Sequence, residues 1–107
     1  MAKLICIYWR DIPAQVVGRA GRKGGVKKEL APRFATAIDR AAMRAGRGSS
    51  DAYLEDWRRV SEDVTGDLES LVNERVRELE EQFDESSLEA LVKAGGSMEV
   101  ANERAKG

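Results

Sequence analysis

Residues 3–10, KLICIYWR, would form a strand that is apolar on both of its faces. Two sets of side chains alternate along it: Leu4, Cys6 and Tyr8 on one face, and Ile5, Ile7 and Trp9 on the other. A strand of this kind belongs in the interior of a sheet, with cover on both sides. In a chain of 107 residues, long enough for one modest core, the stretch therefore predicts the central strand of a small sheet.

The following residues predict further strands and helices around this one. Pro13 ends the first strand, and residues 14–20 predict a second, antiparallel strand. Pro32 suits the first turn of a helix, and residues 57–66 predict a third strand. Asp67 begins a long amphipathic helix, and Ser86 with Glu89 forms a capping-box pattern for a shorter helix.

This order predicts an α+β fold, ββαβαα. A right-handed crossover from the second strand to the third gives a three-stranded, mainly antiparallel sheet of order 2-1-3, with helices on one face. Something else must then cover the other face. We predict a single domain over residues 1–94, with residues 95–107 as a polar, frayed C-terminal tail.

Residues 18–28, GRAGRKGGVKK, combine four glycines with five cations and predict a loop or a loose strand end. Glycine permits a close approach of an anion to the backbone, and the cations supply charge. The segment lacks the spacing of a P-loop and of G-x-G-x-x-G. A solvated connector, an anion or nucleic-acid site, and a contact for an acidic protein all remain open. The candidate anion- or partner-binding residues are Arg19, Arg22, Lys23, Lys27, Lys28, Arg40 and Arg44.

Charge is divided unevenly along the chain. Residues 1–60 carry a net charge of +7 and residues 61–107 a net charge of -8, within an overall net charge of -1. The two halves could pair within one molecule, pair between molecules, or serve separate partners. An acidic half that is simply a solvated helix face is the fourth alternative.

The chain contains no histidine and one cysteine. This composition excludes Ser-His and Cys-His nucleophile pairs, zinc sites that use histidine, and thiolate metal clusters. We therefore expect no catalytic residue, no metal and no cofactor. No apolar run approaches the ~18 residues of a membrane span, and the start lacks the features of a signal peptide. These absences predict a cytoplasmic protein.

Three motifs carry a resemblance to a known family: YWRDIPAQV, RFATAIDRAAMRAG and YLEDWRR. They resemble the small bacterial domain termed virulence factor, which is similar to the domain at the end of conserved virulence factor C proteins. The resemblance covers about residues 3–83. It implies an association with folate- or corrinoid-dependent methyl-transfer enzymes, and it brings no catalytic residues with it.

Together these features predict a non-catalytic accessory module that binds another protein through an uncovered sheet face, as a heteromer or a homodimer. The interface candidates are Ile5, Ile7, Trp9 and Trp57. The alternative is an anion- or nucleic-acid-binding domain that uses residues 18–28 and the arginines of the first helix. An enzyme is the third and least favoured class.

Overall fold

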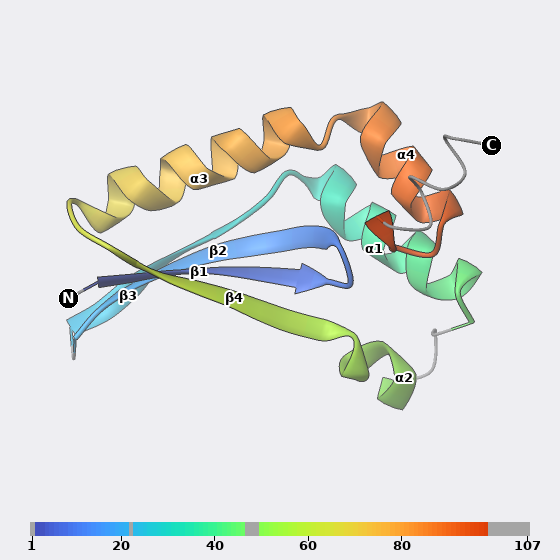
Figure 1. Cartoon of the computed structure of the whole chain (residues 1–107), viewed down its shortest axis with the longest axis horizontal. Coiled ribbons are helices and arrows are strands. Elements are labelled where there is room, and N and C mark those ends of the chain that lie inside the picture. The colour runs from blue at the N-terminus through green and yellow to red at the C-terminus, as the bar shows by residue number, and fades with distance from the viewer. Residues whose placement is uncertain (1, 22, 47–49, 99–107) are drawn as a thin grey trace.

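Within the part of the chain that the structure describes, four strands form one antiparallel sheet in the order β3-β2-β1-β4, and four helices accompany it (Figure 1). The computed structural model describes residues 2–21, 23–46 and 50–98. The elements are β1 (Ala2–Trp9), β2 (Ile12–Ala20), β3 (Lys23–Glu29), α1 (Pro32–Arg44), α2 (Ser50–Glu55), β4 (Trp57–Val64), α3 (Leu68–Gln82) and α4 (Glu85–Lys93).

β1 lies in the interior of the sheet, which confirms the prediction from its two apolar faces. It pairs with β2 on one side and with β4 on the other, both antiparallel. Ile5 faces Val17 of β2 and Ser61 of β4 in these pairings. The predicted order of the three strands, second-first-third, is therefore correct for β2, β1 and β4.

The predicted number of strands was wrong, because residues 23–29 form a fourth strand, β3, at the edge of the sheet. Glycine and lysine are depleted in strands, which concealed it. Gly25 lies so close to β2 that a Cβ atom would collide with the Gly18 carbonyl oxygen, so glycine is needed for this pairing. Lysines along an exposed edge strand also discourage pairing with another chain.

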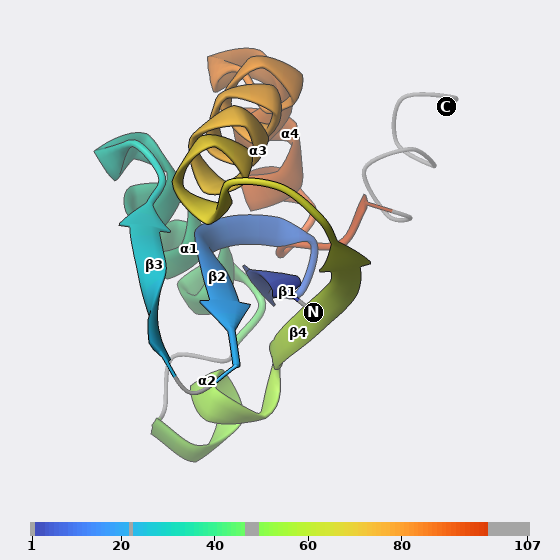
Figure 2. The ribbon, with the colours of Figure 1, turned by 90° about the vertical axis from the view of Figure 1, so that its left-hand side faces the viewer.

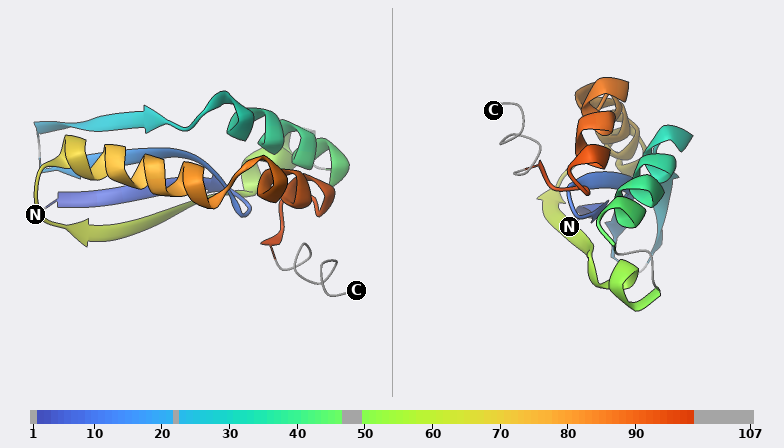
Figure 3. Two further views of the ribbon diagram at one scale, coloured as in Figure 1. Left: turned by 90° about the horizontal axis from the view of Figure 1, so that it is seen from above. Right: turned by 90° about the vertical axis from the view of Figure 1, so that its right-hand side faces the viewer.

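α3 lies along one face of the sheet (Figures 2 and 3). Its buried side chains, Val72, Val76 and Leu79, join Leu4 and Cys6 of β1 in one apolar core. The 3.6-residue period of α3 and the two-residue period of β1 thus direct their apolar sides toward each other. This packing fixes which face of the sheet is covered.

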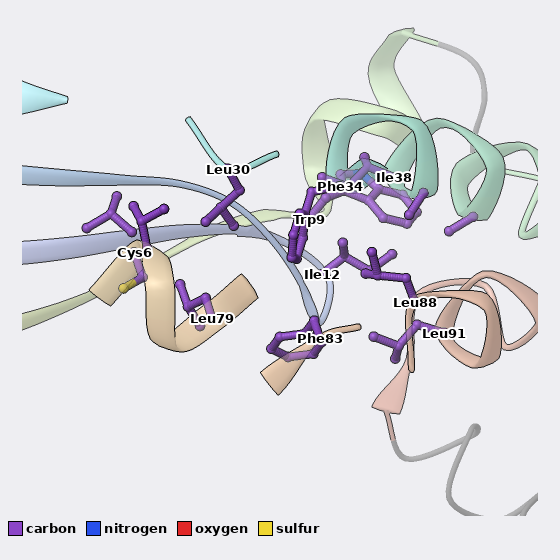
Figure 4. Close-up of a cluster of buried hydrophobic side chains, with 14 of the residues drawn as sticks. Cys6, Trp9, Ile12, Leu30, Phe34, Ile38, Leu79, Phe83, Leu88 and Leu91 are labelled. Atoms are coloured by element: carbon purple, nitrogen blue, oxygen red, sulfur yellow. The ribbon is translucent and has the colours of Figure 1, made fainter. Parts of the chain in front are cut away.

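α1 and α4 pack against each other beyond the end of the sheet (Figure 3). Phe34 of α1 meets Phe83 edge-to-face, with 6.5 Å between ring centroids. Leu88 and Leu91 of α4 extend the same core toward Ile38 (Figure 4). The helices therefore lengthen the core instead of forming a second layer over the sheet.

Aspartates cap both C-terminal helices. Asp67, the predicted start of the long helix, accepts a hydrogen bond from the Ser70 backbone N–H at 3.0 Å. The predicted start of the last helix at Ser86 was wrong: α4 begins at Glu85, and Asp84 accepts from the Ser87 N–H at 2.8 Å. An aspartate is a strong N-cap, so it starts the helix before the Ser86 pattern can.

Two glycines after α4 bring the chain back against β1. Gly95 and Gly96 are buried and have positive φ values of 68° and 92°. A Cβ atom at Gly96 would lie 2.9 Å from the ring of Trp9, which is itself fully buried. Residues 95–98 therefore contact the domain, residues 99–107 lie outside the described part, and the division at residue 94 stays a prediction.

We expect Gly96→Ala to lower the free energy of unfolding by about 1–3 kcal/mol more than Gly46→Ala does. Both substitutions place a Cβ on a left-handed backbone, at φ values of 92° and 72°. Of the two, Gly96 alone would also displace a buried ring, since no atom of the described residues lies within 4 Å of a Cβ at Gly46. Urea unfolding of both variants measures the difference, and equal losses would contradict the contact with Trp9.

We expect acid to weaken both helix caps. The hydrogen bonds from Ser70 and Ser87 lower the pKa of Asp67 and of Asp84 in the folded protein. Their contribution to stability is therefore present above the ordinary aspartate pKa, about 3.9, and is lost as the pH falls through that value and below it.

The double variant Asp67→Asn/Asp84→Asn tests this, because asparagine is also a good N-cap but does not titrate. Its stability should fall less than that of the parent between about pH 5 and pH 2 in urea unfolding. Parallel losses in the two proteins would show that the caps do not carry the acid sensitivity.

Candidate functional site: the uncovered face of the sheet

The face of the sheet opposite α3, termed here the uncovered face, carries a mixed apolar and basic surface. Among the described residues, α3 is the helix that runs along the sheet, and α2 reaches only the end of the opposite face (Figure 2). Strand register places alternate residues on this face: Lys3, Ile5, Ile7, Gln15, Val17, Arg19, Gly25, Lys27, Glu29, Arg59, Ser61 and Asp63. Ile5, Ile7 and Val17 are only half-buried there.

Two hollows join to form one groove along the uncovered face. The first, of about 560 Å³, lies over the strands and is lined by Ile7, Val17, Arg19 and Arg59 together with Gln15 and Lys27. The second, of about 590 Å³, lies toward the helices and is lined by Leu30, Ile38, Tyr53 and Trp57. Gln15 and Lys27 line both hollows, so the two are contiguous.

The groove is electrostatically asymmetric. The hollow over the strands has Arg19, Lys27 and Arg59 in its lining and no aspartate or glutamate among the described residues that line it. The hollow beside α1 includes Glu29 and Asp39. Positive charge is therefore concentrated at one end of the groove, and the aromatic side chains lie at the other.

The four interface candidates do not all lie at the surface. Ile5 and Ile7 lie on the uncovered face. Trp9 is fully buried, its Nε1 donates to the Tyr53 carbonyl at 2.9 Å, and its ring stacks on Tyr53. Trp57 is half-buried, meets Tyr53 edge-to-face and lines the groove. Trp9 therefore supports the groove from within, and Trp57 is one of its walls.

The candidate anion-binding residues do not gather in one place. Arg19 and Lys27 line the groove, but Lys28 lies on the α3 side and donates to Asn73 at 3.1 Å. Arg22 lies outside the described residues, and Lys23 is the first residue of β3. β3 causes this separation, because consecutive residues of a strand point to opposite faces.

The two candidates from α1 bind α4. Arg40 forms a two-pronged ion pair with Glu89, at 2.8 and 3.1 Å, and this bond lowers the pKa of the Glu89 carboxyl. Arg44 donates from Nε to the Lys93 carbonyl at 3.0 Å. Two arginines of the basic half, residues 1–60, therefore bind groups of the acidic half, residues 61–107. The two halves thus pair within one molecule at these contacts.

A cluster that the sequence interpretation missed surrounds the two-residue turn between β1 and β2. Arg10, with a φ of 54°, pairs with Asp56 at 3.2 Å and donates to the Gly95 carbonyl. Asp11 accepts from Arg58 at 3.1 Å and from the Met98 N–H at 2.7 Å. The sequence did contain a signal. Residues 9–11 read WRD and residues 56–58 read DWR, so when Trp9 pairs with Trp57 in the sheet, each arginine comes near an aspartate of the other segment.

Cys6 is buried on the α3 side of the sheet. Burial raises the pKa of its thiol, although Arg75 of α3 contacts the sulfur at 3.7 Å. A raised thiol pKa keeps the group neutral and weakly nucleophilic near neutral pH. Cys6 therefore packs as a small apolar residue.

Among the residues that the structure describes, no group of three or more histidine, cysteine, aspartate or glutamate side chains is placed to hold a metal ion. None of the helices within 2–21, 23–46 and 50–98 is long and apolar enough to cross a membrane.

We expect Leu4→Asp to abolish folding and Ile7→Asp to cost only about 1–2 kcal/mol. Leu4 is 2% exposed in the core under α3, whereas Ile7 is half-buried on the uncovered face and its partner across the strands is Arg59. Circular dichroism and urea unfolding of the two variants compare the faces directly. Loss of folding in both would mean that the second face is also core.

No curated protein and no solved structure showed significant similarity to the chain. The sequence model of the family described as Virulence factor matches residues 7–92, well over half of the chain. The chain therefore belongs to the Virulence factor family.

Proposed function

We propose that this protein is a non-catalytic accessory module that binds another protein through the uncovered face. The observation that carries the proposal is the groove, in which half-buried Ile7 and Val17 lie beside exposed arginines and the ring of Trp57. Exposed apolar surface rimmed by polar residues is typical of protein-binding sites.

The composition of the groove supports a protein partner. Tyrosine, tryptophan and arginine are enriched at the energetic centres of protein interfaces, and Tyr53, Trp57, Arg19 and Arg59 line this groove. Beneath it, Trp9 is fully buried and its ring stacks on that of Tyr53, so the wall of the groove is packed against the core. A preformed surface loses little conformational entropy on binding.

An anion or a nucleic acid is the second candidate. Arg19, Lys27 and Arg59 share one hollow, and their charge would attract phosphate. A mobility shift with RNA or DNA at low salt that disappears as salt is raised would favour this candidate. Indifference to both nucleic acids at low salt would exclude nucleic acid as the ligand.

The resemblance to the family suggests the first partners to test. We propose a folate- or corrinoid-dependent methyl-transfer enzyme of the cytoplasm as the leading class of partner. No residue of the groove is assigned to that chemistry, so the role proposed for this chain is attachment and not reaction.

Site-specific photo-cross-linking tests the proposal. A benzophenone amino acid at Val17 places the probe on the uncovered face, and the same amino acid at Arg77 places it on an exposed position of α3. Cells that carry the tagged full chain should yield a discrete cross-linked protein from position 17 and none from position 77. Identical products from both positions, or no product from position 17, would count against the uncovered face as the binding site.

A further inference from the structure

We infer that the occupant of the groove is an acidic amphipathic helix of a different protein, and not a second copy of this chain. The inference rests on the proposed function and adds the chemistry of the partner. Its basis is the arrangement of charged, aliphatic and aromatic residues along the groove.

The charges argue against pairing of two uncovered faces. A symmetric dimer whose two-fold axis passes over the hollow on the strands would bring Arg19, Lys27 and Arg59 of one copy toward the same cations of the other. No aspartate or glutamate lines this hollow among its described residues. Like charges across an interface are unfavourable, and a surface that supplies carboxylates is the favourable complement.

The opposite face of the same sheet indicates the shape of the occupant. There, α3 places Val72 and Val76 against the apolar residues of β1 and β2. On the uncovered face, Ile5, Ile7 and Val17 form a comparable aliphatic strip across the same two strands. Because α3 closes one face of this sheet with an apolar stripe, an amphipathic helix of a partner can match the strip on the other face in the same way.

The second hollow indicates where the apolar anchor of the partner helix would lie. Leu30, Ile38, Tyr53 and Trp57 form the apolar part of its lining, and the half-buried rings of Tyr53 and Trp57 suit contact with an apolar side chain as an anchor. Glu29 and Asp39 in the same lining disfavour carboxylates there. The helix therefore places its apolar anchor beside α1 and its acidic side chains over Arg19 and Arg59.

The middle of the groove favours protein over nucleic acid. Binding of single strands on a sheet commonly uses exposed aromatic rings on which bases stack. Here the strip over the strands is aliphatic, and the rings of Tyr53 and Trp57 lie at one end, in contact with each other. Phosphate could meet the cations, but the bases would lack platforms above β1 and β2.

The test uses synthetic helical peptides of about 18 residues, five turns, and the full-length chain. Two peptides carry the same apolar stripe of leucine and phenylalanine. The remaining positions are glutamate and glutamine in the acidic peptide, and lysine and glutamine in the basic peptide. Fluorescence anisotropy compares them, with an oligouridine of similar charge as a third probe, at about 20 and 150 mM salt. Arg59→Glu is the test variant, and Arg77→Glu, on the exposed side of α3, is the control with the same change in charge.

We expect the acidic peptide to bind at low salt and the basic peptide to bind at least about tenfold more weakly. Arg59→Glu should weaken the acidic peptide about tenfold, and the effect should shrink at high salt. Arg77→Glu should leave binding unchanged. Circular dichroism of both variants establishes that they fold.

Three results would overturn the inference: equal binding of the two peptides, tighter binding of the oligouridine, or self-association of the parent that Arg59→Glu abolishes. The last two would identify nucleic acid or a second copy as the occupant. A specific cross-link from Val17 combined with no preference for the acidic peptide would remove this inference and leave the proposed function standing. Absence of that cross-link would remove the proposed function itself.

Discussion

The burial of Trp9 at the end of the central strand is the constraint on which most of the structure depends. Its ring stacks on Tyr53, its Nε1 donates to the Tyr53 carbonyl, and Gly96 passes within contact distance. Elements from the start, middle and end of the chain therefore meet at one side chain. A fully buried tryptophan contributes a large apolar area, and the ion pairs of the adjacent turn surround it at the surface.

The sequence predicted the centre of the sheet better than its edge. The central position of β1 could be recognised because its side chains are apolar on both faces, a pattern typical of a strand in the interior of a sheet. β3 could not, since its lysines and glycines have low strand propensity and its structure depends on pairing with β2. The same strand also places the cations of the basic segment on opposite faces of the sheet: Lys27 lines the groove, and Lys28 donates to Asn73.

The site was predictable only in part, for a related reason. Ile5 and Ile7 could be assigned to one face from their spacing, but the cations beside them come from β2, β3 and β4. Arg59 in particular gave no signal of its own, because only the register of β4 places it across from Ile7. Composition and periodicity do not predict contacts between residues that are far apart in the sequence.

The docking of residues 95–98 on the first turn has a consequence for how the chain reaches its final state. Arg10 bonds to Gly95, and Asp11 bonds to Gly96 and Met98, across more than eighty intervening residues. Contacts between such distant residues slow folding, because a long loop must close before they form. During synthesis from the N-terminus, these contacts can form only after residues 95–98 have emerged, and a ribosome stalled before residue 96 would hold a chain in which Gly96 does not yet cover the ring of Trp9.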